Sequence, residues 1–66
     1  MDKKAIARRL RELRGGRTAK ELAAELGVSR SAVAMYERGA RVPGDEVKIR
    51  YAKVFGVSVE ALFYAN

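Results

Sequence analysis

TAKELAAELGVSRSAVAMYERG, residues 18–39, is the stretch that decides the fold of this chain. Apolar side chains recur every three or four residues on both sides of the Gly-Val-Ser segment at 27–29, which predicts two helices joined by a very short link. Such a link does not allow an antiparallel hairpin with long faces in contact. It favours two helices that cross at a steep angle, as in a helix-turn-helix.

Local signals set the starts of these two helices. Thr18 and Glu21 have the spacing of a capping box, in which each side chain bonds the other residue's backbone amide. The first helix is therefore predicted to begin after Thr18. Ser29 is a good N-cap, and the second helix is expected over about 29–38, where a glycine ends it.

Three residues of this stretch have the types that a helix-turn-helix requires. Ala23 is small enough for the two helices to approach closely. Gly27 provides the left-handed turn that only glycine adopts without strain. Val33 is an apolar anchor on the second helix, so we expect these three residues to support it structurally.

The flanking sequence completes an all-α domain. Asp2 is predicted to cap a helix over 3–14, Asp45 to cap a fourth helix, and Ser58 to cap a short fifth helix. With 66 residues, the chain is expected to be one domain over 1–66, a compact five-helix bundle.

The apolar stripes of the flanking helices indicate their buried faces. In the first helix, Ile6, Leu10 and Leu13 recur at helical spacing and are expected in the core. In the fourth helix Tyr51 belongs to the apolar stripe, whereas Ile49 lies off it and is expected at a flank or an interface.

The composition excludes several kinds of site. The chain has no cysteine and no histidine, so it lacks the residues of disulfides and thiolate metal sites and the commonest general base. No catalytic constellation and no phosphate-binding glycine loop is visible. We therefore expect no enzyme activity, no metal, no cofactor and no small-molecule ligand.

No apolar segment is long enough to span a bilayer, and the charged N-terminus does not resemble a signal peptide. We therefore expect a protein of the cytoplasm that does not associate with membranes.

The positive charge is unevenly distributed. The net charge is +6; residues 1–41 contain eleven Lys and Arg against five Asp and Glu, whereas residues 42–66 contain three of each kind. This distribution favours a polyanion-binding face in the first two thirds of the chain. The alternative is a basic surface that only increases solubility.

The motif and its surroundings resemble the phage-repressor/Cro-type helix-turn-helix family of bacterial and phage transcriptional regulators. The resemblance covers nearly the whole chain: RLRELR precedes the motif, RVPGDEVKIRYAKVFGVS follows it, and VEALF closes the domain. It implies a lambda-repressor-like DNA-binding domain. Family members commonly have glutamine at the position of Ala19, where it touches DNA phosphate or a base, and Ala19 cannot make that contact.

The face of the second motif helix opposite Val33 is predicted to read DNA bases in the major groove. An arginine can bond guanine O6 and N7 together, a serine specifies weakly, and small or apolar side chains lie against thymine methyl groups. The predicted base-reading residues are Arg30, Ser31, Ala34 and Met35; the predicted phosphate contacts are Arg17, Thr18, Lys20, Arg38 and Arg41. The alternatives are that the charges are merely solvated and that Met35 fills a core edge.

Glu37 would repel DNA if it faced the phosphates. The resemblance implies instead that it pairs with an arginine at the end of the first helix. Arg14 is the expected partner and Arg11 the other candidate.

The sequence predicts a sequence-specific double-stranded DNA-binding regulator, a repressor that acts as a homodimer on a two-part operator. The dimer interface is expected at Leu62, Phe63 and Tyr64; alternatively, these aromatic residues pack into their own core. Two other functions stay open: a protein-interaction module such as an antitoxin-type helix-turn-helix protein, and a nonspecific nucleoid or RNA binder.

Overall fold

The computed structural model describes residues 2–65, and all regular structure in that range is helical. Residues 1 and 66 of the predicted domain lie outside the described range. The predicted all-α class is confirmed. The elements are α1 (Lys3–Arg14), α2 (Ala19–Leu26), α3 (Arg30–Glu37), α4 (Asp45–Phe55) and η1 (Glu60–Tyr64), the last a short π-helical turn.

Asp2 and Ser29 are N-caps as predicted, and Ser58 forms a cap-like hydrogen bond although the N-cap of η1 is Val59. Asp2, Ser29 and Ser58 each accept a hydrogen bond from the backbone amide three residues later, at 3.2, 3.0 and 3.0 Å. The prediction for Asp45 was wrong, because Gly44 is the N-cap and Asp45 is the first residue of α4. An acidic residue in the first turn still interacts favourably with the positive end of the helix dipole, and this explains the misassignment.

The core forms around Tyr51, which is fully buried on α4. The rings of Tyr36 and Phe63 approach the Tyr51 ring edge-on, with centroids 6.1 Å away in both cases, and Phe55 lies at 5.6 Å. Around these rings pack apolar side chains from the other helices, so each helix contributes to one cluster: Ile6, Leu10, Leu22, Ala23, Leu26, Val33 and Leu62.

The buried face of α1 differs from the predicted stripe at its C-terminal end. Ile6 and Leu10 are buried as expected, but Leu13 is 40% exposed and Ala7 is buried instead. Arg14, the next residue, forms an ion pair with Glu37 of α3. Leu13 therefore lies outside the buried part of the predicted stripe.

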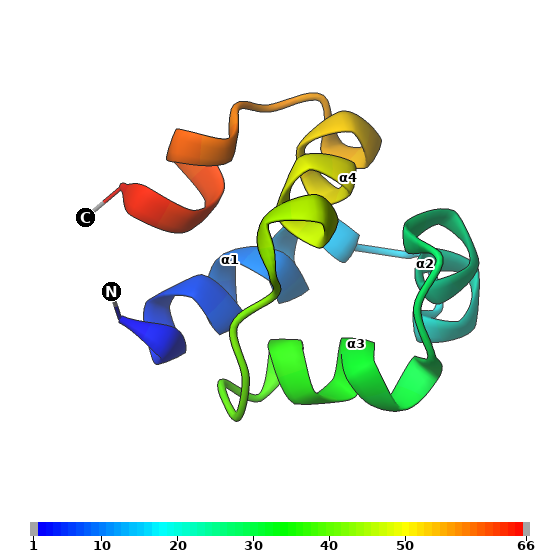
Figure 1. Ribbon diagram of the computed structural model, residues 1–66. Coiled ribbons are helices and arrows are strands. Elements are labelled where there is room, and N and C mark those ends of the chain that lie inside the picture. The colour runs from blue at the N-terminus through cyan, green and yellow to red at the C-terminus, as the bar shows by residue number, and fades with distance from the viewer. Residues whose placement is uncertain (1, 66) are drawn as a thin grey trace.

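The C-terminal segment is held against the rest of the domain by two cationic side chains. Arg9 of α1 donates hydrogen bonds to the carbonyls of Leu62 and Ala65, the latter at 2.8 Å. Lys48 of α4, itself buried, donates to the Tyr64 hydroxyl at 2.8 Å. Figure 1 shows this red segment beside the N-terminal half of α1.

Leu62 and Phe63 of this segment do not lie at the surface, as the predicted dimer interface required. Both side chains lie in the core of their own chain, with exposed fractions of 1% and 2%. Tyr64, at 53%, is the exposed member of the three residues assigned to a dimer interface.

The capping box of α2 predicts a pH dependence of folding. The Thr18 amide donates to the Glu21 carboxylate at 2.8 Å, and this bond together with the Thr18 hydroxyl holds the pKa of Glu21 below its ordinary value. A carboxyl group with a lowered folded pKa stabilises the fold fully above the unfolded pKa of about 4.3. The contribution is lost as pH falls through the folded pKa.

We therefore expect the stability difference between the wild type and Glu21→Gln to shrink as the pH is lowered from 7 to 3. The substituted glutamine keeps a carbonyl acceptor for the Thr18 amide but has no charge to lose. Thermal unfolding followed by circular dichroism measures this difference. If the wild type and Glu21→Gln lose the same stability between pH 7 and pH 3, the charge of Glu21 does not stabilise the capping box.

Candidate nucleic-acid interface

The turn between α2 and α3 has the geometry that the sequence predicted. Gly27 follows α2 in the left-handed conformation, with φ of +69°. A Cβ atom there would also lie 3.0 Å from Arg50 Nη1, so both the backbone angle and the available space favour glycine. Figure 1 shows α2 crossing over the N-terminal end of α3, which lies along one side of the molecule.

Arg50 is a structural residue that the sequence analysis did not identify. Its guanidinium donates to the Leu26 carbonyl at the end of α2, at 3.0 Å, and pairs with Glu46 at 2.7 Å. The i, i+4 spacing of Glu46 and Arg50 signalled the ion pair, but nothing in the sequence pointed to the contact with α2.

The two faces of α3 separate as expected. Val33 and Tyr36 are buried against the core, and Ala23 of α2 is 4% exposed at the helix crossing. On the opposite face Arg30, Ser31 and Ala34 are exposed, and Met35 is half-buried. The structure therefore brings the first three predicted reading residues together on one open face.

A shallow hollow lies between the N-terminal turns of α2 and α3. Its volume is about 490 Å³, and it is lined by Ala19, Arg30, Ser31 and Ala34. Small side chains at Ala19 and Ala34 leave this space open, so that a convex surface can approach the backbone of both helices. Ala19 thus leaves open a space at a position where a glutamine would form a hydrogen bond.

All five predicted phosphate contacts are exposed, and four of them form two groups at the ends of the motif. Thr18 and Lys20 lie at the start of α2, and Arg38 and Arg41 follow the end of α3. The Thr18 oxygen accepts from the Glu21 amide at 3.1 Å, as part of the capping box.

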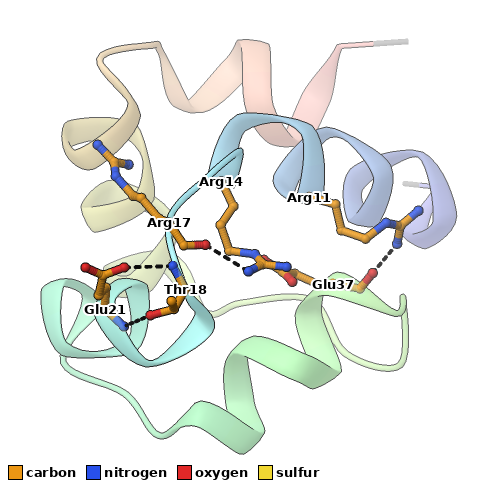
Figure 2. A network of polar contacts seen from close by, with 6 residues as sticks. All are labelled: Arg11, Arg14, Arg17, Thr18, Glu21 and Glu37. Atoms are coloured by element: carbon orange, nitrogen blue, oxygen red, sulfur yellow. Dashed lines mark hydrogen bonds and ion pairs between the residues drawn. The ribbon is translucent and has the colours of Figure 1, made fainter.

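Arg17 does not join this group. Its guanidinium lies 5.7 Å from the centre of the Phe55 ring, in cation–π geometry. Figure 2 shows the side chain extending away from Thr18 toward α4.

Glu37 is the last residue of α3 and is joined to α1 by both of its candidate partners. Arg14 Nε lies 2.8 Å from the Glu37 carboxylate, so the expected ion pair is present. Arg11 donates instead to the Glu37 backbone carbonyl (Figure 2). Arg14 also donates to the Arg17 carbonyl at 2.9 Å, which attaches the loop before α2 to the same cluster.

Solvent has little access to the two atoms that face each other in the Arg14–Glu37 ion pair. Arg14 Nε and the facing Glu37 oxygen are both shielded, and their contact is an ion pair without hydrogen-bond geometry. The Tyr51 hydroxyl is also buried and has no hydrogen-bond partner among residues 2–65. Burial, and then the charge of Glu37, raise the pKa of Tyr51 well above its ordinary value, so the hydroxyl stays neutral.

The comparison with family models agrees with this geometry. The model described as Helix-turn-helix matches residues 8–62, from α1 to η1. The chain belongs to the Cro-type helix-turn-helix family. It is therefore a DNA-binding helix-turn-helix regulator, of a family that is regulatory rather than enzymatic. No curated protein and no solved structure showed significant similarity to this regulator.

Over residues 2–65, no group of three or more His, Cys, Asp or Glu side chains is arranged to hold a metal ion. In the same range, no helix is both long and apolar enough to cross a membrane.

We expect that removal of one partner of the Arg14–Glu37 ion pair lowers the stability of the fold by more than the net contribution of the intact pair. Glu37→Ala should lower the free energy of unfolding by about 1–3 kcal/mol, because Arg14 is left largely shielded and unpaired. Combining Arg14→Ala with Glu37→Ala should cost less than the sum of the two single changes. Urea unfolding of the four proteins measures the coupling, and additive effects would show that the pair is not coupled.

Proposed function

We propose that this regulator is a sequence-specific DNA reader and a repressor, with α3 lying in the major groove. The observation that carries the proposal is the open face of α3, where Arg30 and Ser31 stand beside the hollow at Ala34. Small side chains allow the helix to sit deep in a groove about 12 Å wide. Exposed cationic residues beyond each end of the motif would contact the two flanking backbones.

Arg30 is the residue with the greatest capacity for base recognition. It is exposed in the first turn of α3, and recognition helices place their N-terminal residues at the base edges. A guanidinium that bonds guanine O6 and N7 discriminates by about 1–3 kcal/mol against the wrong base. Ser31 and Ala34 adjust fit at the neighbouring base pairs.

Repression follows directly from occupancy. A regulator that covers an operator within a promoter excludes the polymerase from the same DNA, and this mechanism needs no further surface. Transcription in vitro from a promoter that overlaps the selected site tests this step. Stimulated rather than reduced transcription would identify an activator.

The experiment that tests sequence recognition is selection of binding sites from randomised duplex DNA, followed by measurement of affinities for the enriched site. Two half-sites about one helical turn apart would support a dimeric reader. Enrichment of no sequence would favour the nonspecific binder. No DNA binding at all would favour the protein-interaction module.

On the selected site, Arg30→Ala should remove the preference for guanine at one position of each half-site, with a loss of about 1–3 kcal/mol there. The matched control is Arg38→Gln, which we expect to weaken all sequences alike because it removes a phosphate contact. An unchanged guanine preference in Arg30→Ala would assign base reading to another residue. Circular dichroism checks that both variants are folded.

We further propose that the regulator forms a homodimer through the surface at Tyr64. This side chain is 53% exposed, and it borders a hollow of about 480 Å³ that also includes Ala5, Ile6 and Phe63. A two-fold arrangement would bring this partly apolar surface of each copy against the same surface of the other.

Tyr64→Ser should therefore weaken self-association, and sedimentation across a range of protein concentrations measures it. Leu13→Ser is the matched control, because Leu13 is also a large exposed apolar residue but lies at the other end of α1. Equal dimer dissociation constants for wild type and Tyr64→Ser would remove the interface from this surface.

A further inference from the structure

A line of side chains on α1 leads past the C-terminal end of α3. Lys4, Ala7, Arg11 and Arg14 lie at i, i+3, i+7 and i+10, and therefore share one face of the helix. Arg14 and Arg11 both bind Glu37, and Ala7 is buried. Lys4, the N-terminal member of the line, accordingly lies on the side of α1 that faces the turn after α3.

The close approach at Gly39 fixes this placement. Gly39 follows α3 with φ of +76°, and a Cβ atom there would lie 3.3 Å from the Lys3 carbonyl oxygen and 3.7 Å from Lys4 Cα. The first turn of α1 thus packs directly on the turn that separates Arg38 from Arg41. Figure 1 shows the N-terminus of α1 beside this connection.

Four exposed cationic residues flank that contact, two on each side. Lys3 and Lys4 belong to α1, and Arg38 and Arg41 to the segment after α3; all four side chains are exposed. We call them the four-cation surface. Within residues 2–65, none of the four takes part in an ion pair. The nearest acidic residue in the sequence is Asp2, whose carboxylate accepts from two amides of α1.

The two lysines are unfavourable for the fold itself. They occupy the first turn of α1, the positive end of the helix dipole, where acidic side chains are stabilising and cationic ones are not. No acidic residue is present in that turn of α1. Two adjacent exposed lysines at this helix end, beside a turn that is flanked by two exposed arginines, point to a polyanion as the partner.

We propose that Lys3 and Lys4 complete a backbone-binding site with Arg38 and Arg41, which holds the DNA sugar–phosphate chain beyond the C-terminal end of α3. The inference rests on the proposed function, because α3 in the groove brings its C-terminal end to a flanking backbone. The site positions the protein on the duplex and carries no base preference. Each lysine neutralises one phosphate and releases its counterions.

The test is the salt dependence of DNA binding by Lys3→Gln/Lys4→Gln. Each phosphate contact contributes about 0.9 to the slope of log K against log salt concentration, so the double variant should have a slope smaller by about 1.8 per bound protomer. Between 50 and 200 mM salt, the wild type should then lose about tenfold more affinity than the variant. The consensus sequence should be unchanged.

The control is Lys53→Gln, which removes an exposed lysine from the last turn of α4 and should leave the slope unaltered. A second measurement uses a duplex trimmed at the flank of the half-site. Trimming should weaken the wild type more than the double variant, since the double variant has already lost the two lysine contacts to the removed phosphates.

The possible outcomes distinguish this inference from the proposed function on which it rests. A slope for Lys3→Gln/Lys4→Gln equal to that of Lys53→Gln overturns the four-cation surface, even if the protein selects a clear operator. A reduced slope on DNA of any sequence, without enrichment of a site, supports the surface and contradicts sequence-specific reading. Absence of DNA binding overturns both.

Discussion

The contact between the end of α1 and the end of α3 is the constraint on which the interface depends. Arg14 binds the Glu37 carboxylate and Arg11 its carbonyl, so one residue of α3 is fixed by two side chains from the same helix. An eight-residue helix has little stability of its own, since isolated helices of that length do not form in water. Its direction is therefore set by what holds its two ends.

The position of the N-terminal end of α3 is fixed by the turn between α2 and α3. Ser29 caps the helix, and Gly27 directs the chain back from α2, whose own end is bound by Arg50 of α4. Between these ends, Val33 and Tyr36 pack against the aromatic core around Tyr51. The face that carries Arg30 is consequently presented by a helix fixed at its start, its middle and its end. Such rigidity is what recognition of base edges within hydrogen-bond distance requires.

The sequence predicted the features that depend on near neighbours. The caps at Asp2, Thr18 and Ser29 and the turn at Gly27 could be read directly, because each involves residues within a few positions of one another. The partner of Glu37 came from the family resemblance, since the chain offered two arginines at similar distance. Asp45 was misassigned because the first helical position and the cap favour the same residue type.

Contacts between distant segments could not be predicted in the same way. Arg9 and Leu62 are 53 positions apart, and Arg50 and Leu26 are 24 apart. No periodicity in the sequence relates them, so the sequence left open whether the C-terminal residues form an interface or, as the structure shows for Phe63, pack into their own core. Leu13 was misplaced for a related reason, because helical spacing alone does not show which members of an apolar stripe the other helices cover.

Three helix ends in this protein are bound by the same kind of side-chain contact. A carbonyl in the last turn of α2, α3 and η1 accepts a hydrogen bond from an arginine of a different helix, namely Arg50, Arg11 and Arg9. A planar guanidinium reaches two acceptors at once, as Arg9 and Arg50 do here, whereas an ammonium group acts as a single point. Arginine and lysine are therefore not interchangeable in this small basic domain. An exposed lysine such as Lys3 could be replaced by arginine without loss of a contact, whereas a lysine in place of an arginine that closes a helix end would keep the charge and lose the contacts.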